Sequence, residues 1–172
     1  MLKLRKNKKG FTLVELIVVI AIMAVLAGVV AGVTVSQLNK QTDKTGATQA
    51  NTVASFISEC ALTGDEPATQ IVKSTSVTEG DTTTDKNVFI VKKVKDLITA
   101  QYTAASIPVE NTTNNTIGNT KGQVYITFGK EPGTGDDATA DTVIVTYKPK
   151  ASGTKTTTFT INADGVVTKS EA

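Results

Sequence analysis

The sequence predicts an α+β protein in which the second half of a long N-terminal α-helix packs on a C-terminal antiparallel β-sheet head. Three observations favour this fold. Residues 11–35 form an almost purely apolar run, which suits a membrane-spanning first half of the helix. Residues 50–61 then show apolar side chains at helical spacing, which is typical of an amphipathic second half. After residue 122, apolar and polar residues alternate in short segments, which is typical of strands.

Residues 1–10 form a leader with basic residues and no acid. Its cations are Lys3, Arg5, Lys6, Lys8 and Lys9. Positive charge before an apolar run keeps that side of a membrane protein cytoplasmic. An ordinary secretory signal peptide and an uncleaved single-pass anchor are the alternatives. The first would need a shorter apolar core that ends in a small-residue cleavage site.

The apolar run 11–35 spans roughly 37 Å at the helical rise per residue, which is enough to cross a bilayer. Glu15 is the one charged residue in it. A charge at the centre of a membrane span costs about 2.5–3.5 kcal/mol, so Glu15 calls for a partner, with snorkelling to the interface as the alternative. Gly28 and Gly32 have the spacing that lets helices approach closely. We expect a continuous helix here, and local melting around these glycines is the alternative.

One ordered motif joins the leader to the apolar run: Lys9, Gly10, Phe11, Thr12, Leu13, Val14, Glu15 and Leu16. Together with the basic leader and the unbroken apolar helix, it resembles the prepilin signal of type IV pilins and the related pseudopilins. The resemblance covers about the first forty residues. It implies that a membrane aspartyl prepilin peptidase cuts after Gly10 and that the new amino group of Phe11 is N-methylated.

The resemblance also implies that Glu15 pairs with the amino terminus of Phe11 on a neighbouring subunit, which would set the register of assembly. The chemistry of the residues agrees, because cleavage would create an ammonium at Phe11 and Glu15 is the only anion in the run. Opposite charges in a low-dielectric setting attract strongly, and truncation of one leaves the other unpaired.

The helix should continue past the membrane to about residue 62. Its second half carries a stripe made of Ala50, Val53, Ala54, Phe56, Ile57, Cys60 and Ala61. Gly64 fits a helix C-cap, and Pro67 follows as a breaker. The expected organisation is a leader at 1–10, a transmembrane or filament-core helix at 11–35, an amphipathic half at 36–62 and a globular α+β head at 63–172.

The first part of the head is predicted to contain a connecting loop and a second helix. Residues 64–87 are polar and rich in Thr, Asp and Gly, which indicates a connecting loop region, with short ordered pieces as an alternative. Residues 87–102 fit a helix by apolar spacing, although residues 88–91 also fit a strand. The basic cluster at residues 92–95 is interpreted as a solvated face, with a docking patch as the alternative.

The second part of the head is predicted to be a four-stranded antiparallel meander, with strands at residues 123–128, 142–148, 156–161 and 166–169. One face of it should cover the amphipathic half of the first helix. Residues 108–121 are interpreted as a loop, and their two formal N-glycosylation sequons as turn formers. The acidic loop 131–141 offers oxygen ligands for calcium, although acids in a surface loop are common and the spacing is not that of an EF-hand.

Composition argues against an enzyme, and no cofactor is expected. The chain has no histidine and no tryptophan, so neither a Ser-His nor a Cys-His pair can form. Its one cysteine, Cys60, is expected to be a small buried residue and excludes an intrachain disulfide. That departs from many Gram-negative type IV pilins and resembles Gram-positive ones, clostridial ones especially. Loss of the five leader cations would change the net charge from +2 to −3, which gives no support to nucleic-acid binding by the head.

The leading interpretation is a structural subunit of a type IV pilus for motility, adhesion, biofilm formation or DNA uptake. The resemblance implies identical or related pilin subunits, a prepilin peptidase, an assembly ATPase and a platform protein as partners. It places the chain in the cell membrane before assembly, with a cytoplasmic N-terminus, and in an extracellular filament afterwards. A pseudopilin of a type II secretion or competence machinery is the main alternative, and an unrelated receptor on a plain anchor is another.

Overall fold

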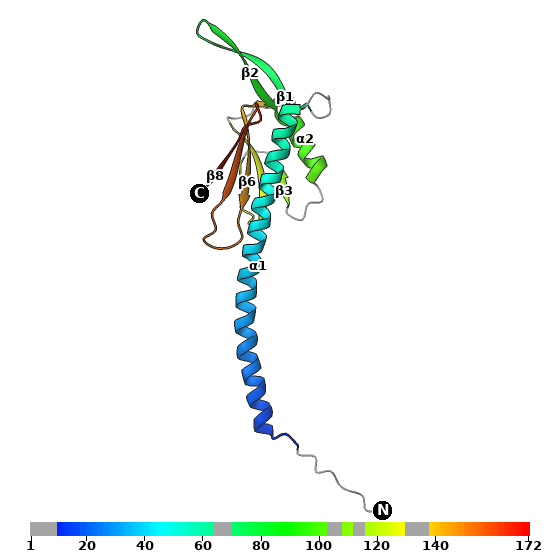
Figure 1. Ribbon diagram of the computed structural model, residues 1–172, viewed down its shortest axis with the longest axis vertical. Coiled ribbons are helices and arrows are strands. Elements are labelled where there is room, and N and C mark those ends of the chain that lie inside the picture. Colours follow the sequence, from blue (N-terminus) through cyan, green and yellow to red (C-terminus); the bar gives the residue numbers. More distant parts are fainter. Residues whose placement is uncertain (1–9, 64–69, 103–107, 112–115, 130–137) are drawn as a thin grey trace, which may run out of the picture. The chain divides into compact units, whose positions relative to one another are not determined.

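The computed structural model describes residues 10–63, 70–102, 108–111, 116–129 and 138–172 (Figure 1). The leader residues 1–9, the Gly64 cap and most of the acidic loop lie outside these residues. The contacts divide the chain into two units, Met1–Leu38 and Asn39–Ala172. Helix α1, Leu13–Thr63, begins in the first unit and ends in the second, close to both predicted bounds.

In the first unit, every residue of α1 from Leu13 to Leu38 is exposed. The second unit, by contrast, contains a packed core. We call this unit the head, and it includes the second part of α1 as well as the residues that follow the helix. Its main sheet has the strand order β3-β4-β6-β7-β8. The bounds are Val109–Asn111 for β3, Gln123–Gly129 for β4, Thr142–Lys148 for β6, Thr157–Asn162 for β7 and Val167–Glu171 for β8.

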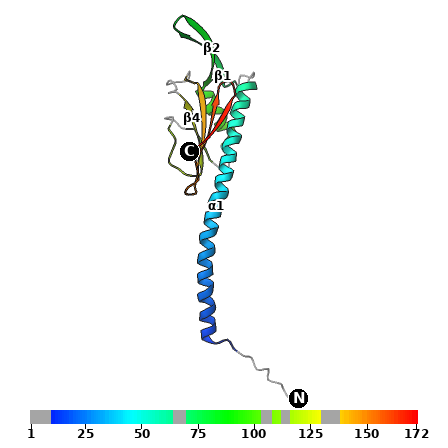
Figure 2. The same cartoon turned by 60° about the vertical axis from the view of Figure 1, so that its left-hand side comes forward.

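The four predicted strands are confirmed as β4, β6, β7 and β8, and each pairs with the next in antiparallel register. The turn between the last two contains Gly165, whose φ of 78° suits glycine. Figures 1 and 2 show the head portion of α1 lying along this sheet. The predicted α+β layout is therefore confirmed.

The core of the head forms between α1 and one face of the sheet. The helix contributes a stripe of buried residues, Asp43, Gly46, Ala50, Val53, Ala54, Ile57 and Cys60. The sheet contributes Val124, Ile126, Phe128, Val143, Val145, Tyr147, Phe159 and Ile161. Cys60 is buried among these residues, as predicted. Burial of apolar surface on this scale is the main force that holds a helix on a sheet.

The predicted loop at residues 64–87 is wrong for most of its described part. Strand β1, Val72–Glu79, and strand β2, Thr82–Ile90, form an antiparallel hairpin with Gly80 in its turn at a φ of 65°. A composition rich in threonine indicates a loop because threonine is polar. Threonine is also β-branched, however, and favours strands. Phe89 packs in the core at the base of the hairpin, whereas the described residues from 74 to 87 are not buried and are held by backbone pairing.

Both interpretations of residues 87–102 are partly right. The chain stays in strand β2 to Ile90 and then enters helix α2, Val91–Tyr102, which buries Val91, Val94 and Ile98. In the basic cluster, the Lys95 ammonium lies 5.6 Å from the centroid of the Phe128 ring.

The predicted loop at residues 108–121 is wrong at its start, where β3 pairs with β4 in parallel. Strand β5, Thr139–Ala140, pairs with β2 in a second sheet of order β1-β2-β5. This strand occupies the described end of the predicted acidic loop. Beside it, Asp141 forms an ion pair with Lys86 at 3.0 Å.

Candidate functional site

The bond between Gly10 and Phe11 lies just before α1, in backbone that is neither helix nor strand. The Phe11 side chain is 92% exposed. A Cβ added to Gly10 would meet no heavy atom within 4 Å, and Gly10 does not adopt a positive φ. Neither packing nor backbone conformation in the described chain therefore requires glycine here.

Thr12 and Glu15 cap the N-terminus of α1 through reciprocal hydrogen bonds. The Thr12 N–H donates to Glu15 Oε2 at 2.8 Å, and the Thr12 hydroxyl donates to the same oxygen at 2.9 Å. The Glu15 N–H approaches Thr12 Oγ1 at 3.3 Å. This arrangement is a capping box, which satisfies backbone donors that a helix end otherwise leaves unpaired. The acid of the apolar run therefore has a partner on its own chain.

The sequence interpretation gives Glu15 a partner on another subunit, or contact with the membrane interface as the alternative. It missed the spacing of Thr12 and Glu15, which is the sequence signature of a capping box. Both bonds from Thr12 end on Oε2, and within the described part of the chain no hydrogen bond ends on Oε1. The carboxylate can therefore cap its own helix and still accept a bond from a second molecule.

The apolar half of α1, Leu13–Leu38, exposes large side chains along its whole length. Their exposed fractions run from 48% at Val19 to 73% at Leu13. A Cβ at Gly28 or Gly32 would meet nothing within 4 Å, so packing within the chain does not explain these glycines. By length and composition α1 can cross a membrane, with a mean hydropathy of 3.0 over its most apolar window. Such a surface is stable only when lipid or other apolar side chains cover it.

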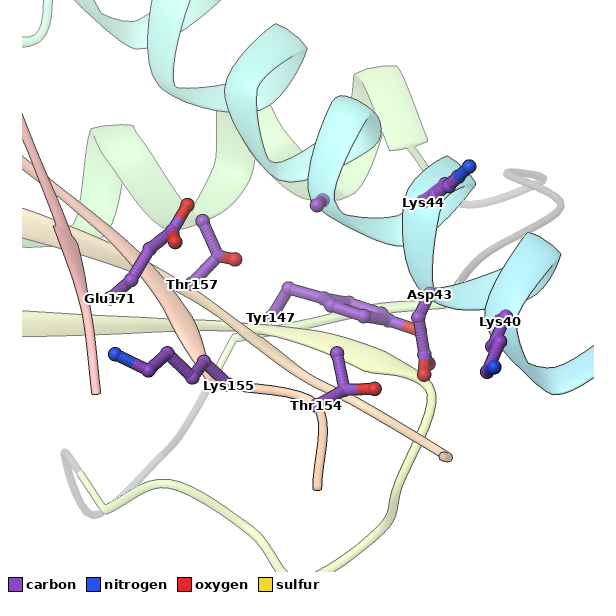
Figure 3. A pocket seen from close by; sticks show the side chains of 9 residues that line it. Lys40, Asp43, Lys44, Tyr147, Thr154, Lys155, Thr157 and Glu171 are labelled. Atoms are coloured by element: carbon purple, nitrogen blue, oxygen red, sulfur yellow. The ribbon is translucent and has the colours of Figure 1, made fainter. Parts of the chain in front are cut away.

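The head contains a second polar cluster, at its contact between α1 and the sheet (Figure 3). Asp43 lies on the buried stripe of α1 and is 4% exposed. Its Oδ1 accepts hydrogen bonds from the Tyr147 hydroxyl at 2.9 Å and from the Lys150 N–H at 2.7 Å. Its Oδ2 accepts one from the Ala151 N–H at 2.9 Å. Buried carboxylates persist when they are hydrogen-bonded in this way.

These bonds set the protonation states of Asp43 and Tyr147. Burial of Asp43 acts to raise its pKa, but the hydrogen bonds from Lys150, Ala151 and Tyr147, with one from the Thr154 side chain, together hold that pKa below its usual value. Burial of Tyr147, with the Asp43 charge beside it, raises the pKa of the phenol. The charged carboxylate thus fixes the segment after β6 to α1. The cluster has the geometry of a structural contact.

The Tyr147 ring lies directly against Gly46. A Cβ at Gly46 would stand 2.0 Å from the nearest ring carbon. Sequence interpretation began the stripe at Ala50 and missed both Asp43 and Gly46. Their spacing from Ala50, three or four residues at each step, continues the same helical face and is the signal that could have found them.

The described residues contain no group of three His, Cys, Asp or Glu side chains placed to hold a metal ion. The acidic loop considered for calcium lies largely outside them.

Residues 5–31 match a family model described as the prokaryotic N-terminal methylation motif. The match contains Gly10, Phe11, the capping box and Gly28, and it ends one residue before Gly32. Comparison with characterised proteins found no match, and comparison with solved structures found none. The resemblance to clostridial pilins is therefore not confirmed.

Proposed function

We propose that this chain, whose residues 5–31 match the prokaryotic N-terminal methylation motif, is a prepilin and a structural subunit of a type IV pilus. The proposal rests on one observation: the methylation motif and an exposed apolar helix occur in the same segment. The methylation motif covers the start of a helix whose apolar half has every residue exposed. A segment that must be covered by lipid or by copies of itself suits a subunit that leaves a membrane for a filament.

The first step of the proposed function is hydrolysis of the Gly10–Phe11 peptide bond by a prepilin peptidase. Water supplies the atoms that leave a carboxylate on Gly10 and an ammonium on Phe11. After loss of one proton, the Phe11 amine takes a methyl group from a methylsulfonium donor, which leaves as the neutral thioether. The exposed, non-helical backbone at this bond gives a protease access. Cleavage also removes the cations that hold the N-terminus on the cytoplasmic side.

The second step is packing of the apolar half of α1 among like helices. Lipid contacts are exchanged for protein contacts, so close packing and polar bonds supply the specificity. The open space around Gly28 and Gly32 lets another helix approach closely. The free Oε1 of Glu15 is available for the Phe11 ammonium of a neighbour, while Oε2 continues to cap the helix. Such a buried charge pair sets register more than it adds stability.

The proposed location is the cell membrane before assembly and an extracellular filament afterwards. An assembly ATPase and a membrane platform protein would drive extraction and polymerisation. Motility, adhesion, biofilm formation and DNA uptake are the functions that such a filament serves. The role is mechanical, with no catalytic step assigned to this chain.

Cleavage is tested by replacement of Gly10. Gly10→Leu should leave the precursor unprocessed, because a bulky side chain replaces the small residue that the peptidase reads. Gly10→Ala, which stays small, is the matched control and should be processed. A blot that separates precursor from mature chain reports both, and a mature-size band from Gly10→Leu would contradict the proposal.

The filament role is tested by deletion of the gene followed by electron microscopy of the cell surface. Loss of long filaments supports the pilus subunit. Normal filaments together with failed secretion or failed transformation would assign the chain to a pseudopilus instead.

A further inference from the structure

A groove of about 460 Å³ lies in the head between α1 and the start of β7 (Figure 3). Lys40 and Lys44 border it from the helix, and Lys155 borders it from the segment before β7. All three lysines are exposed. We call this the lysine groove.

The two carboxylates of the lysine groove are already engaged. Asp43 accepts the bonds described above, and Glu171 forms an ion pair with Lys169, which holds its pKa below the usual value. In the described part of the chain no ion pair joins Lys40, Lys44 or Lys155 to an acid within 4.0 Å. Lys155 also interacts electrostatically with Glu171, and Asp43 keeps its charge, but three lysines against two carboxylates leave the groove with a net positive charge that can attract an anionic partner.

The hairpin of β1 and β2 presents a surface of opposite character. Alternate residues of the two strands share one face, which consists of Ser74, Ser76, Thr78, Thr83, Asp85 and Asn87. All six are exposed. Asp164 extends this face at its base, where the Asn87 amide donates to its carboxylate at 3.0 Å. We call this the hydroxyl–acid face, and among its described residues there is no lysine.

This hairpin also has little support within its own chain. In the described part of the chain, residues 74–85 pair only within the hairpin. The contact of β2 with β5 is limited to Phe89 and Ile90, and the bonds of Lys86 to Asp141 and of Asn87 to Asp164 lie at the base of the hairpin. Two-stranded hairpins without a covering layer are marginally stable in water. A partner surface that covers one face would therefore stabilise it.

The lysine groove and the hydroxyl–acid face lie at opposite ends of the head. The groove lies where β7 begins, at Thr157, and Asp164 lies just beyond the end of β7 at Asn162. The length of β7 separates them by roughly 20 Å at the strand rise per residue. One copy therefore cannot fill its own groove, and contact between these surfaces has to be head-to-tail between copies. Such contacts repeat from copy to copy and build an open filament when the rotation between copies does not close a ring, as the proposed function requires.

We infer that the lysine groove of one copy receives the hydroxyl–acid face of the hairpin of a second copy. Asp85 and Asp164 each accept a hydrogen bond within the chain, from Ser76 and Asn87, and their carboxylates, which keep their negative charge, lie against the ammonium groups of Lys40, Lys44 and Lys155. The inference deepens the proposed function and rests on it, since it names the head surfaces through which pilus subunits would meet.

The test uses the full-length chain in detergent micelles, with Cys60→Ala as the background. Lys44→Cys together with Asp85→Cys should give disulfide-linked dimers and larger species under mild oxidation. Asp96 is an exposed acid of α2 outside the hydroxyl–acid face, so Lys44→Cys with Asp96→Cys is the matched control and should stay monomeric. Salt near 1 M shortens the Debye length to about 3 Å and should suppress the cross-link. Equal cross-linking of the two pairs, or none of either, would overturn the inference.

A charge exchange provides a second measurement. Lys40→Glu with Lys44→Glu should weaken self-association about tenfold, since attractions become repulsions at a charged interface. Addition of Asp85→Lys to the same chain should restore part of it. Lys121→Glu, at an exposed lysine outside the groove, is the control and should change little. Failure of the third substitution to restore association would count against the inference.

The two proposals fail in different ways. Specific cross-links with an unprocessed N-terminus and no filaments in cells would keep the head-to-tail contact and remove the pilus role. Processed filaments whose subunits give no specific cross-link would keep the pilus role and remove this contact.

Discussion

The two units of this chain differ in how their apolar side chains are covered: those of the head are mostly buried within the chain, and those of the first unit are exposed. In the head, residues of α1 such as Val53 and Ile57 are fully buried against the sheet. In the first unit, side chains of the same kind, such as Val25 and Leu26, are more than half exposed. The comparison teaches that one helix can carry a face whose partner lies in its own chain and a surface whose partner must come from elsewhere.

The polar residues of the two units repeat this contrast. Asp43 uses both carboxylate oxygens on donors of the head, whereas Glu15 uses one oxygen on its own helix end. An acid with both oxygens engaged fixes a fold. An acid with one oxygen free is suited to fix an assembly.

The largest effect is expected from Glu15→Ala, which removes the carboxylate of the first unit. We expect insertion and cleavage to continue and filament yield to fall to near zero, since the Phe11 ammonium of a neighbour would be left without its partner in an apolar setting. The measurement is the amount of mature chain in the sheared filament fraction. Glu59→Ala changes an exposed acid of the head portion of α1 and serves as the control. Wild-type yield from Glu15→Ala would contradict the pairing.

Truncation of one apolar side chain in each unit shows how much that side chain contributes to the free energy of unfolding of the head. Ile57→Ala removes a fully buried side chain and should lower the free energy of unfolding of the head by about 2–5 kcal/mol. Leu26→Ala removes a side chain that is 59% exposed and should leave that free energy unchanged. Denaturant unfolding of the full chain in detergent measures both, and equal losses would refute the contrast.

Replacement of a glycine by alanine in each unit tests whether packing within the chain leaves room for an added methyl group. Gly46→Ala would place a Cβ against the Tyr147 ring and should destabilise the head by about 1–3 kcal/mol. Gly28→Ala meets nothing in the chain and should leave the head unaffected, while it obstructs close helix approach in the filament. A Gly46→Ala head as stable as the wild type would show that the ring moves freely.

The Asp43 cluster should make the stability of the head depend on pH. The pKa of Asp43 is lower in the folded chain than in the unfolded one, so its contribution is present above the unfolded value of about 3.9 and is lost as pH falls through the folded pKa. Asp43→Asn should cost about 2 kcal/mol at pH 7, because an amide NH₂ replaces one acceptor oxygen among buried donors. The difference from the wild type should shrink in strong acid.

Unfolding curves measured from pH 7 down to pH 2 check this dependence. Asp96→Asn, at an exposed acid of α2, is the matched control and should follow the wild type. A difference between Asp43→Asn and the wild type that stayed constant over this range would rule out titration of Asp43 as the cause.

The smallest expected effect concerns the capping box. Thr12→Val removes the hydroxyl bonds at the start of α1 and should cost about 1 kcal/mol of local helix stability. Hydrogen exchange of the first-turn amides should rise while the amides of the head keep their protection. Unchanged exchange in the first turn would mean that the box adds nothing to the helix end.

Much of the fold could be predicted from the sequence because its signals are local. The apolar run, the stripe from Ala50 and the four alternating strands each repeat with a regular period within a short segment. The β1–β2 hairpin was missed because its threonines and serines do not form an apolar face, and its pairing depends on the partner strand.

The residues of the candidate site could be predicted from the sequence, but only some of the contacts that these residues make could be. The motif indicated Gly10, Phe11 and Glu15, and the role of each in processing and assembly stays a prediction. The bond between Tyr147 and Asp43 joins residues 104 positions apart, and no periodicity in the sequence predicts such a pair.

The central claim is that the apolar half of α1 loses its basic leader and then packs among copies of itself. Mass spectrometry of the N-terminal peptide from sheared surface filaments tests it most directly. We predict a chain that begins at Phe11 with a methylated amino group, as the main species in the filament. A chain that still begins at Met1, or the absence of this chain from the filaments, would contradict the claim.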